Sequence, residues 1–326
     1  MKGPVPSRRS MLRSEDGVAL MMVIWLIALL MTMVLAFSLT MRANMYSAHA
    51  TSEAVRGKCL AQAGLERAIT ELCYKKAGGG GEAPKQETVG WRTDGRPYDD
   101  KVGDDSYVVK VVDESGKIQI NALTDRTGVI LTNLLVTLGV SLDDSYTIVD
   151  SILDWKGTGE LERLHGAKSD YYLSLPVPYK SKNGPFDTLE ELLLVKGITR
   201  EILFGDAKTP GLINFITLFS GNDRININAA PREVLTSIPG ITAEAADQII
   251  TYRSIGEIRG AQEAEALLGN SYAVAAPYIR LEGSNLFSVE SAAVGKDGKT
   301  LTFTVRAVIA VEGPASWRYL YYKSPA

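Results

Sequence analysis

An uninterrupted apolar block near the start of the chain constrains its fold more than any other feature. From Val18 to Leu39 the sequence carries no charged residue, and only Thr32 and Ser38 interrupt the run of apolar side chains. As an α-helix this block is about 33 Å long, which is enough to cross the hydrocarbon layer of a bilayer. The sequence therefore predicts a transmembrane helix over residues 18–39.

The charges beside the block predict its orientation. Basic residues are concentrated in the short segment ahead of it, so by the positive-inside rule the N-terminus lies in the cytoplasm. Everything after Leu39 then lies on the far side, which makes a single-pass protein whose bulk is outside the cytoplasm. The basic residues of this segment are Lys2, Arg8, Arg9 and Arg13.

Two other interpretations of the block compete with a plain anchor. A cleavable secretory signal has an apolar core of about 7–15 residues and a small-residue cut site. This block is longer and offers only Ala36-Phe37-Ser38, so an anchor is favoured. The second interpretation is a type IV prepilin leader, which the basic segment ending at Gly17 resembles. The prepilin peptidase would then cut between Gly17 and Val18, and an ordinary junction before a transmembrane helix is the alternative explanation of this glycine.

Met22 separates this chain from most pilin-like proteins. Such proteins usually carry Glu at the fifth position after the cut, where its carboxylate can neutralise the free amino terminus of a neighbouring subunit. Counted from Val18, that position is Met22. A subunit with no subunit above it has no buried ammonium to pair, so Met22 indicates a place at the tip of an assembly.

The helix is predicted to continue beyond the membrane. No proline occurs from Val18 to Ala83, and small or apolar residues recur at helical spacing after Arg42. We therefore expect one helix from Val18 to about Lys75, with an amphipathic second half, that ends before the run Gly78–Gly81. The alternative is a transmembrane helix and a separate short helix, joined at Gly57 or Gly64.

The two cysteines are not expected to form a disulfide. Cys59 and Cys73 lie in the predicted helix, where their separation is about 21 Å, far beyond bridging distance. We expect both to be small buried apolar residues. With only His49 and His165 in the chain and no closely spaced Cys/His set, a zinc site is improbable.

The rest of the chain predicts an α+β fold in which a helical domain is inserted into a sheet domain. After a loop from Gly78 to about Asp105, strand patterns at 106–112 and 117–121 predict a hairpin. Helical spacing then persists from Thr124 to about Leu268. Further strands are expected at 276–282, 284–294, 300–312 and 316–323. The predicted organisation is a leader at 1–17, a transmembrane helix at 18–39, its amphipathic continuation at 40–76, a loop and first strands at 77–123, an inserted helical domain at 124–270 and the remaining strands at 271–326.

The helical domain contains a weak internal duplication. Residues 183–201 correspond to residues 226–244, and each copy predicts a helix, a tight glycine turn and a second helix capped by Thr199 or Thr242. The second copy resembles a helix-hairpin-helix, which can bind DNA by presenting backbone N–H groups to a phosphate. Acidic residues outnumber basic ones around this turn and no basic stripe is present, so a packing role is favoured and nucleic acid is not expected as a partner.

Taken in order, the motifs of the chain resemble the type II secretion minor pseudopilin K family, also called the general secretion pathway protein K family. The resemblance covers nearly the whole chain after the leader, and the order of the motifs is more specific than any one of them. The segments that carry it are the Gly17/Val18 junction, the missing Glu at Met22, Gly116–Leu123, Ile152–Trp155, Gly166–Tyr172, Pro178–Asn183, Leu189–Leu192, Val195–Ile198 and Ile225–Ala229.

This resemblance implies a pilin-like sheet packed on the long helix, cleavage and N-methylation at Val18, and a site at the tip of a pseudopilus. The implied partners are minor pseudopilins I and J, with H below, in a bacterial inner membrane whose bulk side is the periplasm. Members of the family can bind calcium, and this chain departs from the family pattern at Lys156–Gly159. No EF-hand spacing is present and no calcium site is assigned. The oxygen ligands available in principle are Asp99, Asp100, Asp104, Asp105, Asp150, Asp154, Glu160 and Asp170.

Three classes of function follow, in order of preference. The first is a non-enzymatic tip subunit of a type II secretion pseudopilus, with a minor pilin of a type IV pilus as a close variant. The second is a membrane-tethered DNA-binding protein, as in competence systems, which rests on the segment Ile225–Arg253. An enzyme comes last, because the sequence has no nucleophile elbow, no phosphate loop and no histidine with a recognisable partner.

Overall fold

The computed structural model describes residues 16–77, 91–295 and 297–325. The leader apart from its last two residues, and the glycine run after the long helix, lie outside the described residues. The chain divides into two compact units, residues 1–56 and residues 57–326, and each is described by itself.

Helix α1 (Asp16–Lys76) is continuous through Gly57 and Gly64, so neither glycine is a joint between two helices. In the first unit its large apolar side chains are exposed along the whole predicted anchor. The hydroxyl of Thr32 donates to the Leu29 carbonyl at 2.8 Å, which pairs a polar group within the apolar segment without leaving the helix.

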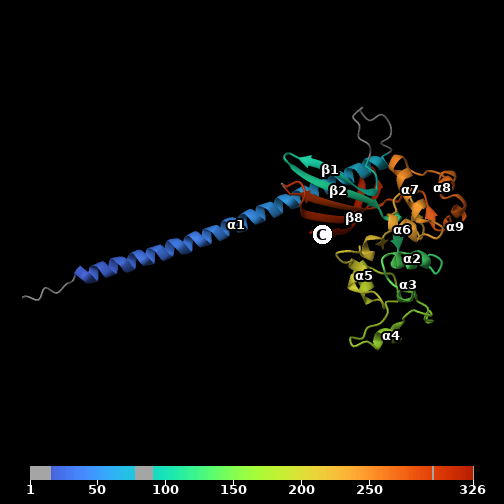
Figure 1. The fold of residues 1–326 in the computed structure, drawn as a ribbon, viewed down its shortest axis with the longest axis horizontal. Helices are drawn as coiled ribbons and strands as arrows, with labels where there is room; N and C mark the ends of the chain where they lie inside the picture. The colour runs from blue at the N-terminus through green and yellow to red at the C-terminus, as the bar shows by residue number, and fades with distance from the viewer. Residues whose placement is uncertain (1–15, 78–90, 296, 326) are drawn as a thin grey trace, which may run out of the picture. The chain divides into compact units, whose positions relative to one another are not determined.

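The second unit contains a five-stranded antiparallel sheet of order β1-β2-β7-β8-β9 (Figure 1). The C-terminal part of α1 packs on one face of this sheet. Leu65 and Ile69 of the helix share a buried cluster with Val109, Val289 and Ile309 of the strands. The strands are β1 (Asp94–Val102), β2 (Asp105–Asp113), β7 (Leu286–Val294), β8 (Leu301–Gly313) and β9 (Ser316–Lys323).

Gly64 allows the helix to approach the sheet closely. A Cβ atom built on Gly64 would lie 2.7 Å from the Tyr107 ring and 2.8 Å from Val109, nearer than real Cβ contacts come. Ser291 of β7 would also be in the way. The glycine therefore has a packing role in a helix interior, where its low helix propensity would otherwise count against it.

The chain between β2 and β7 is largely helical and forms a second, larger core. Its two short sheets pair in parallel, β3 with β4 and β5 with β6. In Figure 1, α4 lies at the end of this segment that is farthest from the five-stranded sheet. The α-helices of this segment are α2 (Gly128–Thr137), α3 (Leu142–Lys156), α4 (Ser169–Leu173), α5 (Arg200–Phe204), α6 (Arg232–Ser237), α7 (Ala243–Ile255), α8 (Ala261–Leu268) and α9 (Tyr272–Ala275). The 3-10 helices are η1 (Glu114–Gly116), η2 (Leu189–Leu194), η3 (Leu212–Asn214) and η4 (Gly269–Ser271), and the short strands are β3 (Ile118–Gln119), β4 (Ile216–Thr217), β5 (Ile225–Asn226) and β6 (Ile279–Arg280).

Two local predictions from the sequence are wrong. The predicted loop up to Asp105 contains β1. This strand lies at the edge of the sheet and pairs only with β2, and edge strands often carry the polar and charged residues that are also typical of loops. The predicted hairpin between 106–112 and 117–121 does not form. Strand β2 pairs with β1 and β7 instead, and β3 pairs in parallel with the distant β4, because η1 redirects the chain.

The cysteines and the later strands also differ in part from expectation. Cys73 is buried, and burial raises the pKa of its thiol, whereas Cys59 is exposed on the helix, so the prediction that both are buried is wrong for Cys59. Both are free, as expected. Of the strand expected at 276–282, only β6 forms, because the backbone N–H groups of Ala276 and Tyr278 donate to the carbonyls of Tyr272 and Ala275 at the end of α9.

The duplicated segments place their glycine turns alike but build different helices. Gly197 and Gly240 both adopt positive φ, at 86° and 88°. Thr199 and Thr242 cap the following helices, accepting from the backbone N–H of Ile202 and Ala245, as predicted. In the second copy the turn joins α6 to α7, whereas in the first it joins the 3-10 helix η2 to the short α5.

Candidate functional site

The first candidate site is the N-terminal part of α1, defined here as the anchor, Val18–Leu39. Its large apolar side chains are exposed, Val18 and Met22 among them at 59% and 63%. By length and composition this helix can cross a membrane. A bare apolar helix of this kind is suited to contact lipid or the helices of other subunits.

The predicted processing residues lie at the start of this helix. Gly17 is within α1, Val18 follows it, and Met22 is one turn further along. The Met22 thioether brings an apolar, uncharged surface to the position where a carboxylate is usual in pilin-like proteins. Cleavage after Gly17 and the role of Met22 at a tip stay predictions.

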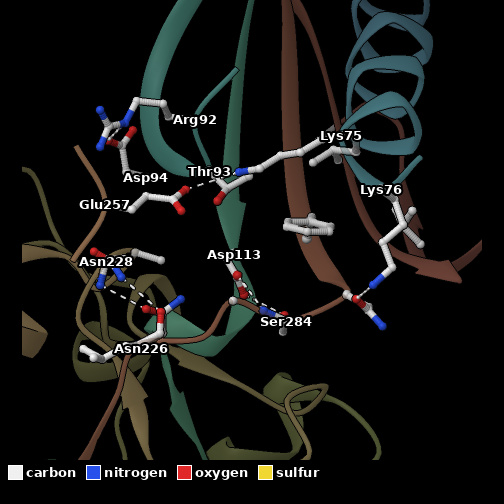
Figure 2. Close-up of a pocket in the computed structure, with 17 residues that line it drawn as sticks. Lys75, Lys76, Arg92, Thr93, Asp94, Asp113, Asn226, Asn228, Glu257 and Ser284 are labelled. Carbon is white, nitrogen blue, oxygen red and sulfur yellow. Dashed lines mark hydrogen bonds and ion pairs between the residues drawn. The ribbon is translucent and has the colours of Figure 1, made fainter. Parts of the chain in front are cut away.

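The second candidate site is the junction where the sheet meets the helical segment, and Asp113 is at its centre. Its Oδ1 accepts from the Ser115 N–H at 2.9 Å, the Ser115 hydroxyl at 2.7 Å and the Ser284 hydroxyl at 2.6 Å. Its Oδ2 accepts from the Ser284 N–H at 2.8 Å (Figure 2). The carboxylate thus ties the end of β2 to the segment that leads back into β7, and it is fully committed to that task.

Two asparagines complete the junction. Asn226 donates to the Ser115 hydroxyl at 3.2 Å. Asn228 donates to the carbonyls of Ile258 and Leu281 at 2.8 and 3.0 Å, so one side chain joins three separated stretches of chain. Gly116 allows the chain around it to approach the segment that contains these asparagines, because a Cβ there would lie 2.6 Å from the Ala229 backbone. Two motifs that carry the family resemblance, around Gly116 and Asn226, therefore meet in space.

A cavity of about 300 Å³ lies beside this junction (Figure 2). Several of its charged groups have hydrogen-bond or ion-pair partners within the chain. Lys75 pairs with Glu257 at 3.4 Å, and Lys76 donates to Asn285 at 2.6 Å. Burial would raise the pKa of the Asp94 carboxyl, but the hydrogen bonds and charge of Arg96 outweigh it and lower that pKa. These pairings suit a structural joint, since none of them sets a nucleophile beside a base.

The arginines of the second repeat bear on the DNA-binding interpretation. Arg253 is buried and donates to the carbonyls of Ile227 and Ala230 at 3.0 and 2.7 Å, and this burial lowers its pKa. Arg232 makes a bidentate pair with Asp247 at 2.7 and 2.9 Å. Both guanidinium groups thus already have partners within the chain, so neither offers an unpaired positive charge beside this turn.

Lys156 holds together one corner of the helical segment. Its ammonium group donates to the carbonyls of Ile120, Asn121 and Leu123, the first two at 3.0 Å. Desolvation lowers the pKa of Lys156 to about 8. The ammonium therefore links the end of α3 to the chain that enters the helical segment, in the way that a small cation bound by carbonyls would.

The carboxylates considered as calcium ligands are dispersed or paired. Asp154 is fully buried and accepts from Arg163 at 2.8 Å, and Asp150 accepts from the His165 N–H at 3.2 Å. Within residues 16–77, 91–295 and 297–325, no three His, Cys, Asp or Glu side chains are grouped so that they could hold a metal ion.

Sequence reasoning missed the internal roles of Lys156 and Arg253. The signal for Lys156 was its place directly after the buried Asp154-Trp155 pair, where a charged side chain must find buried acceptors or leave the core. For Arg253 the signal was helical spacing, since it lies four residues after the buried Ile249 on the inner face of α7.

The chain resembles known proteins of one family. A family model described as type II secretion system (T2SS), protein K matches residues 111–204. The type II secretion system protein K of Klebsiella pneumoniae is 27% identical over 198 residues, which are 56% of this chain and 58% of that protein. The protein of the same name from Pectobacterium carotovorum subsp. carotovorum is 33% identical over 69 residues, 21% of each chain. This chain thus spans less than two thirds of either relative.

Among solved structures, this chain is similar to one in the GspK-GspI-GspJ complex of the enterotoxigenic Escherichia coli type 2 secretion system. The match has a TM-score of 0.49 and 15% identity, and it covers 87% of this chain and 99% of that chain. The family model and the two relatives confirm the resemblance to protein K that the motifs indicated. The matched residues run from the end of β2 to α5, so they include Asp113 and Lys156.

Proposed function

We propose that this chain is a minor pseudopilin of a type II secretion system, a non-enzymatic structural subunit at the tip of the periplasmic pseudopilus. The observation that carries the proposal is the match of residues 111–204 to the protein K family, in a chain that also has a bare apolar helix at 18–39. The helix anchors the protein in the inner membrane before assembly and packs with other helices afterwards.

The proposed partners are minor pseudopilins I and J, with H below them, and the prepilin peptidase. The support for these partners is the family resemblance and the Met22 position. In an assembled filament the helical segment between β2 and β7 adds bulk to a sheet of ordinary pilin size. This bulk, together with the missing carboxylate at Met22, would prevent the addition of a subunit above it.

The proposed chemistry at the N-terminus is cleavage after Gly17 followed by methylation of the Val18 amino group. Intact mass of the protein extracted from its native membrane tests this. We expect a chain that begins at Val18 and carries one extra methyl group. A chain that retains Met1, or one cut near Ser38, would contradict the proposal.

A second experiment tests the assembly role directly. Gly17→Val, in which the residue before the cut is β-branched, is expected to keep the leader attached and to abolish secretion in a strain that lacks the native gene. Met22→Glu leaves the leader site intact and is expected to let the subunit enter positions below the tip. If Met22→Glu left both the composition and the length of the pseudopilus unchanged, this position would not define the tip.

A further inference from the structure

The loop that joins α3 to α4 presents two leucines to solvent. Leu161 and Leu164 are 90% and 91% exposed, more than any other large apolar side chain of the described residues. Single exposed leucines are common on protein surfaces and need no explanation. Two in one short loop, both almost completely exposed, form a local apolar feature that water solvates poorly.

This loop is held from within, so the two leucines are presented on a fixed support. Arg163 lies between them and points inward, where its guanidinium donates to Asp154 at 2.8 Å and to Asp125 at 3.0 Å. Its backbone N–H also donates to Asp154, at 3.0 Å. Lys196 donates to the Gly166 carbonyl at 3.0 Å, which fixes the far end of the loop. A partner would therefore meet a surface that is already ordered, at a lower entropic cost.

Apolar and aromatic groups of α3 extend this surface. The rings of Tyr146 and His165 stack with their centroids 5.9 Å apart, and His165 follows Leu164 directly. Leu142 precedes Tyr146 by four residues, so both lie on one face of α3, and both are exposed. We define the tip patch as Leu142, Tyr146, Leu161, Leu164 and His165.

The charges around the tip patch are unbalanced. The basic side chains of this region pair with backbone carbonyls, with Asp154 or with Asp125, so their charge is engaged within the chain. Lys156 and Arg163 do so as described, and Lys168 donates to the carbonyls of Asp154 and Gly157 at 2.9 and 2.7 Å. The acidic side chains instead flank the patch along α3 and the loop. They are Asp143, Asp144, Asp150, Glu160 and Glu162.

We propose that the tip patch binds a basic amphipathic segment of another protein, in which apolar side chains are flanked by Lys or Arg. The leucines and Tyr146 supply the apolar contact, and the acidic rim selects a positively charged partner and steers it. The same rim repels an anionic lipid surface. The inference goes beyond the proposed role in secretion and does not depend on it, because it rests on the exposure and charge of this patch alone.

The test uses the full chain in neutral detergent micelles and two short helical peptides that carry a benzophenone group. One peptide carries Leu at helical spacing on one face and Lys on the other face, and its counterpart carries Glu in place of Lys. We expect the Lys/Leu peptide to crosslink within 142–146 and 161–165, mapped by mass spectrometry. The yield should fall about tenfold in Leu161→Ser/Leu164→Ser and decline with added salt. Ile255→Ser, at an equally exposed apolar position at the end of α7, is the matched control and should leave the yield unchanged.

Charge reversal sharpens the test because it keeps the leucines. Glu160→Lys/Glu162→Lys should weaken crosslinking by the Lys/Leu peptide and permit crosslinking by the Glu/Leu peptide. Near-ultraviolet circular dichroism verifies that each variant is folded. Equal crosslinking of both peptides to the unaltered chain, or no loss in the double serine variant, would overturn the proposal. So would binding to phosphatidylglycerol vesicles that the serine variant abolishes, since the patch would then be a lipid contact.

Discussion

The two ends of α1 are both apolar, yet they meet opposite surroundings. Leu35 in the anchor is 60% exposed, whereas Leu65, further along the same helix, is fully buried against the sheet. In the anchor, apolar residues occupy every face of the helix. In the later segment they alternate with charged residues, and small residues such as Gly64 and Ala68 occur among them. Apolar residues on one face of a helix thus indicate packing against the same chain, whereas apolar residues on every face indicate contact with lipid or with another protein.

The largest expected difference between the two ends comes from truncating a leucine at each. Leu65→Ala should lower the free energy of unfolding of the second unit by about 2–5 kcal/mol, because it leaves a cavity between helix and sheet. Leu35→Ala is the matched control and should leave that free energy unchanged. Denaturant unfolding of the full chain in neutral detergent, followed by near-ultraviolet circular dichroism, measures both. Equal effects at the two positions would break the comparison.

A charge placed in the anchor should impair membrane insertion and leave the stability of the second unit unchanged. Leu30→Arg should raise the cost of membrane insertion by about 3–4 kcal/mol, because Leu30 is near the middle of the block. The second unit should unfold at the same denaturant concentration as before. Carbonate extraction of membranes and the unfolding curve together test this. If the extracted fraction did not change, the block would not be acting as a membrane span.

Substitution of two glycines of α1 by alanine distinguishes the cost of crowding against the sheet from the gain in helix propensity. Gly64→Ala should destabilise the second unit by about 1–2 kcal/mol, since crowding against Tyr107 and Val109 outweighs the gain in helix propensity. Gly57→Ala is the control, because its new Cβ would come only within 3.0 Å of Phe303. We expect its effect to be smaller than that of Gly64→Ala, because fewer atoms crowd the new Cβ and none comes nearer than 3.0 Å. If both variants were stabilised, the helix would not approach the sheet as closely as described.

The parts of the fold that depend on neighbouring residues could be predicted from the sequence, and the parts that depend on residues far apart in the sequence could not. The long helix and the caps at Thr199 and Thr242 rest on local rules, and they form as expected. The pairing of β3 with β4 was missed because it joins residues about a hundred positions apart, and a local turn signal near Gly116 predicted a hairpin instead. The inward turn of Lys156 likewise depends on carbonyls that no local pattern identifies.

The smallest expected effect is a pH dependence of the free energy of unfolding, and it again differs between the anchor and the second unit. The anchor contains no titrating side chain, so the pH response belongs to the second unit, where burial lowers the pKa of Lys156 to about 8 from an ordinary 10.5. Between these values the unfolded chain binds more protons than the folded one. The contribution of Lys156 to the free energy of unfolding should therefore rise with pH through this window and be constant below it.

Comparison with Lys156→Met isolates this contribution, since groups such as Cys73 titrate in both proteins and cancel in the difference. At neutral pH the variant should be less stable by about 1–3 kcal/mol, because three carbonyls lose their donor. From pH 7.5 to 9.5 that deficit should grow by about 1 kcal/mol, a value discounted for the partial exposure of the site. Denaturant unfolding across this range measures it. A constant deficit would mean that the three carbonyls keep the ammonium charged throughout, so that hydrogen bonding outweighs desolvation at this corner.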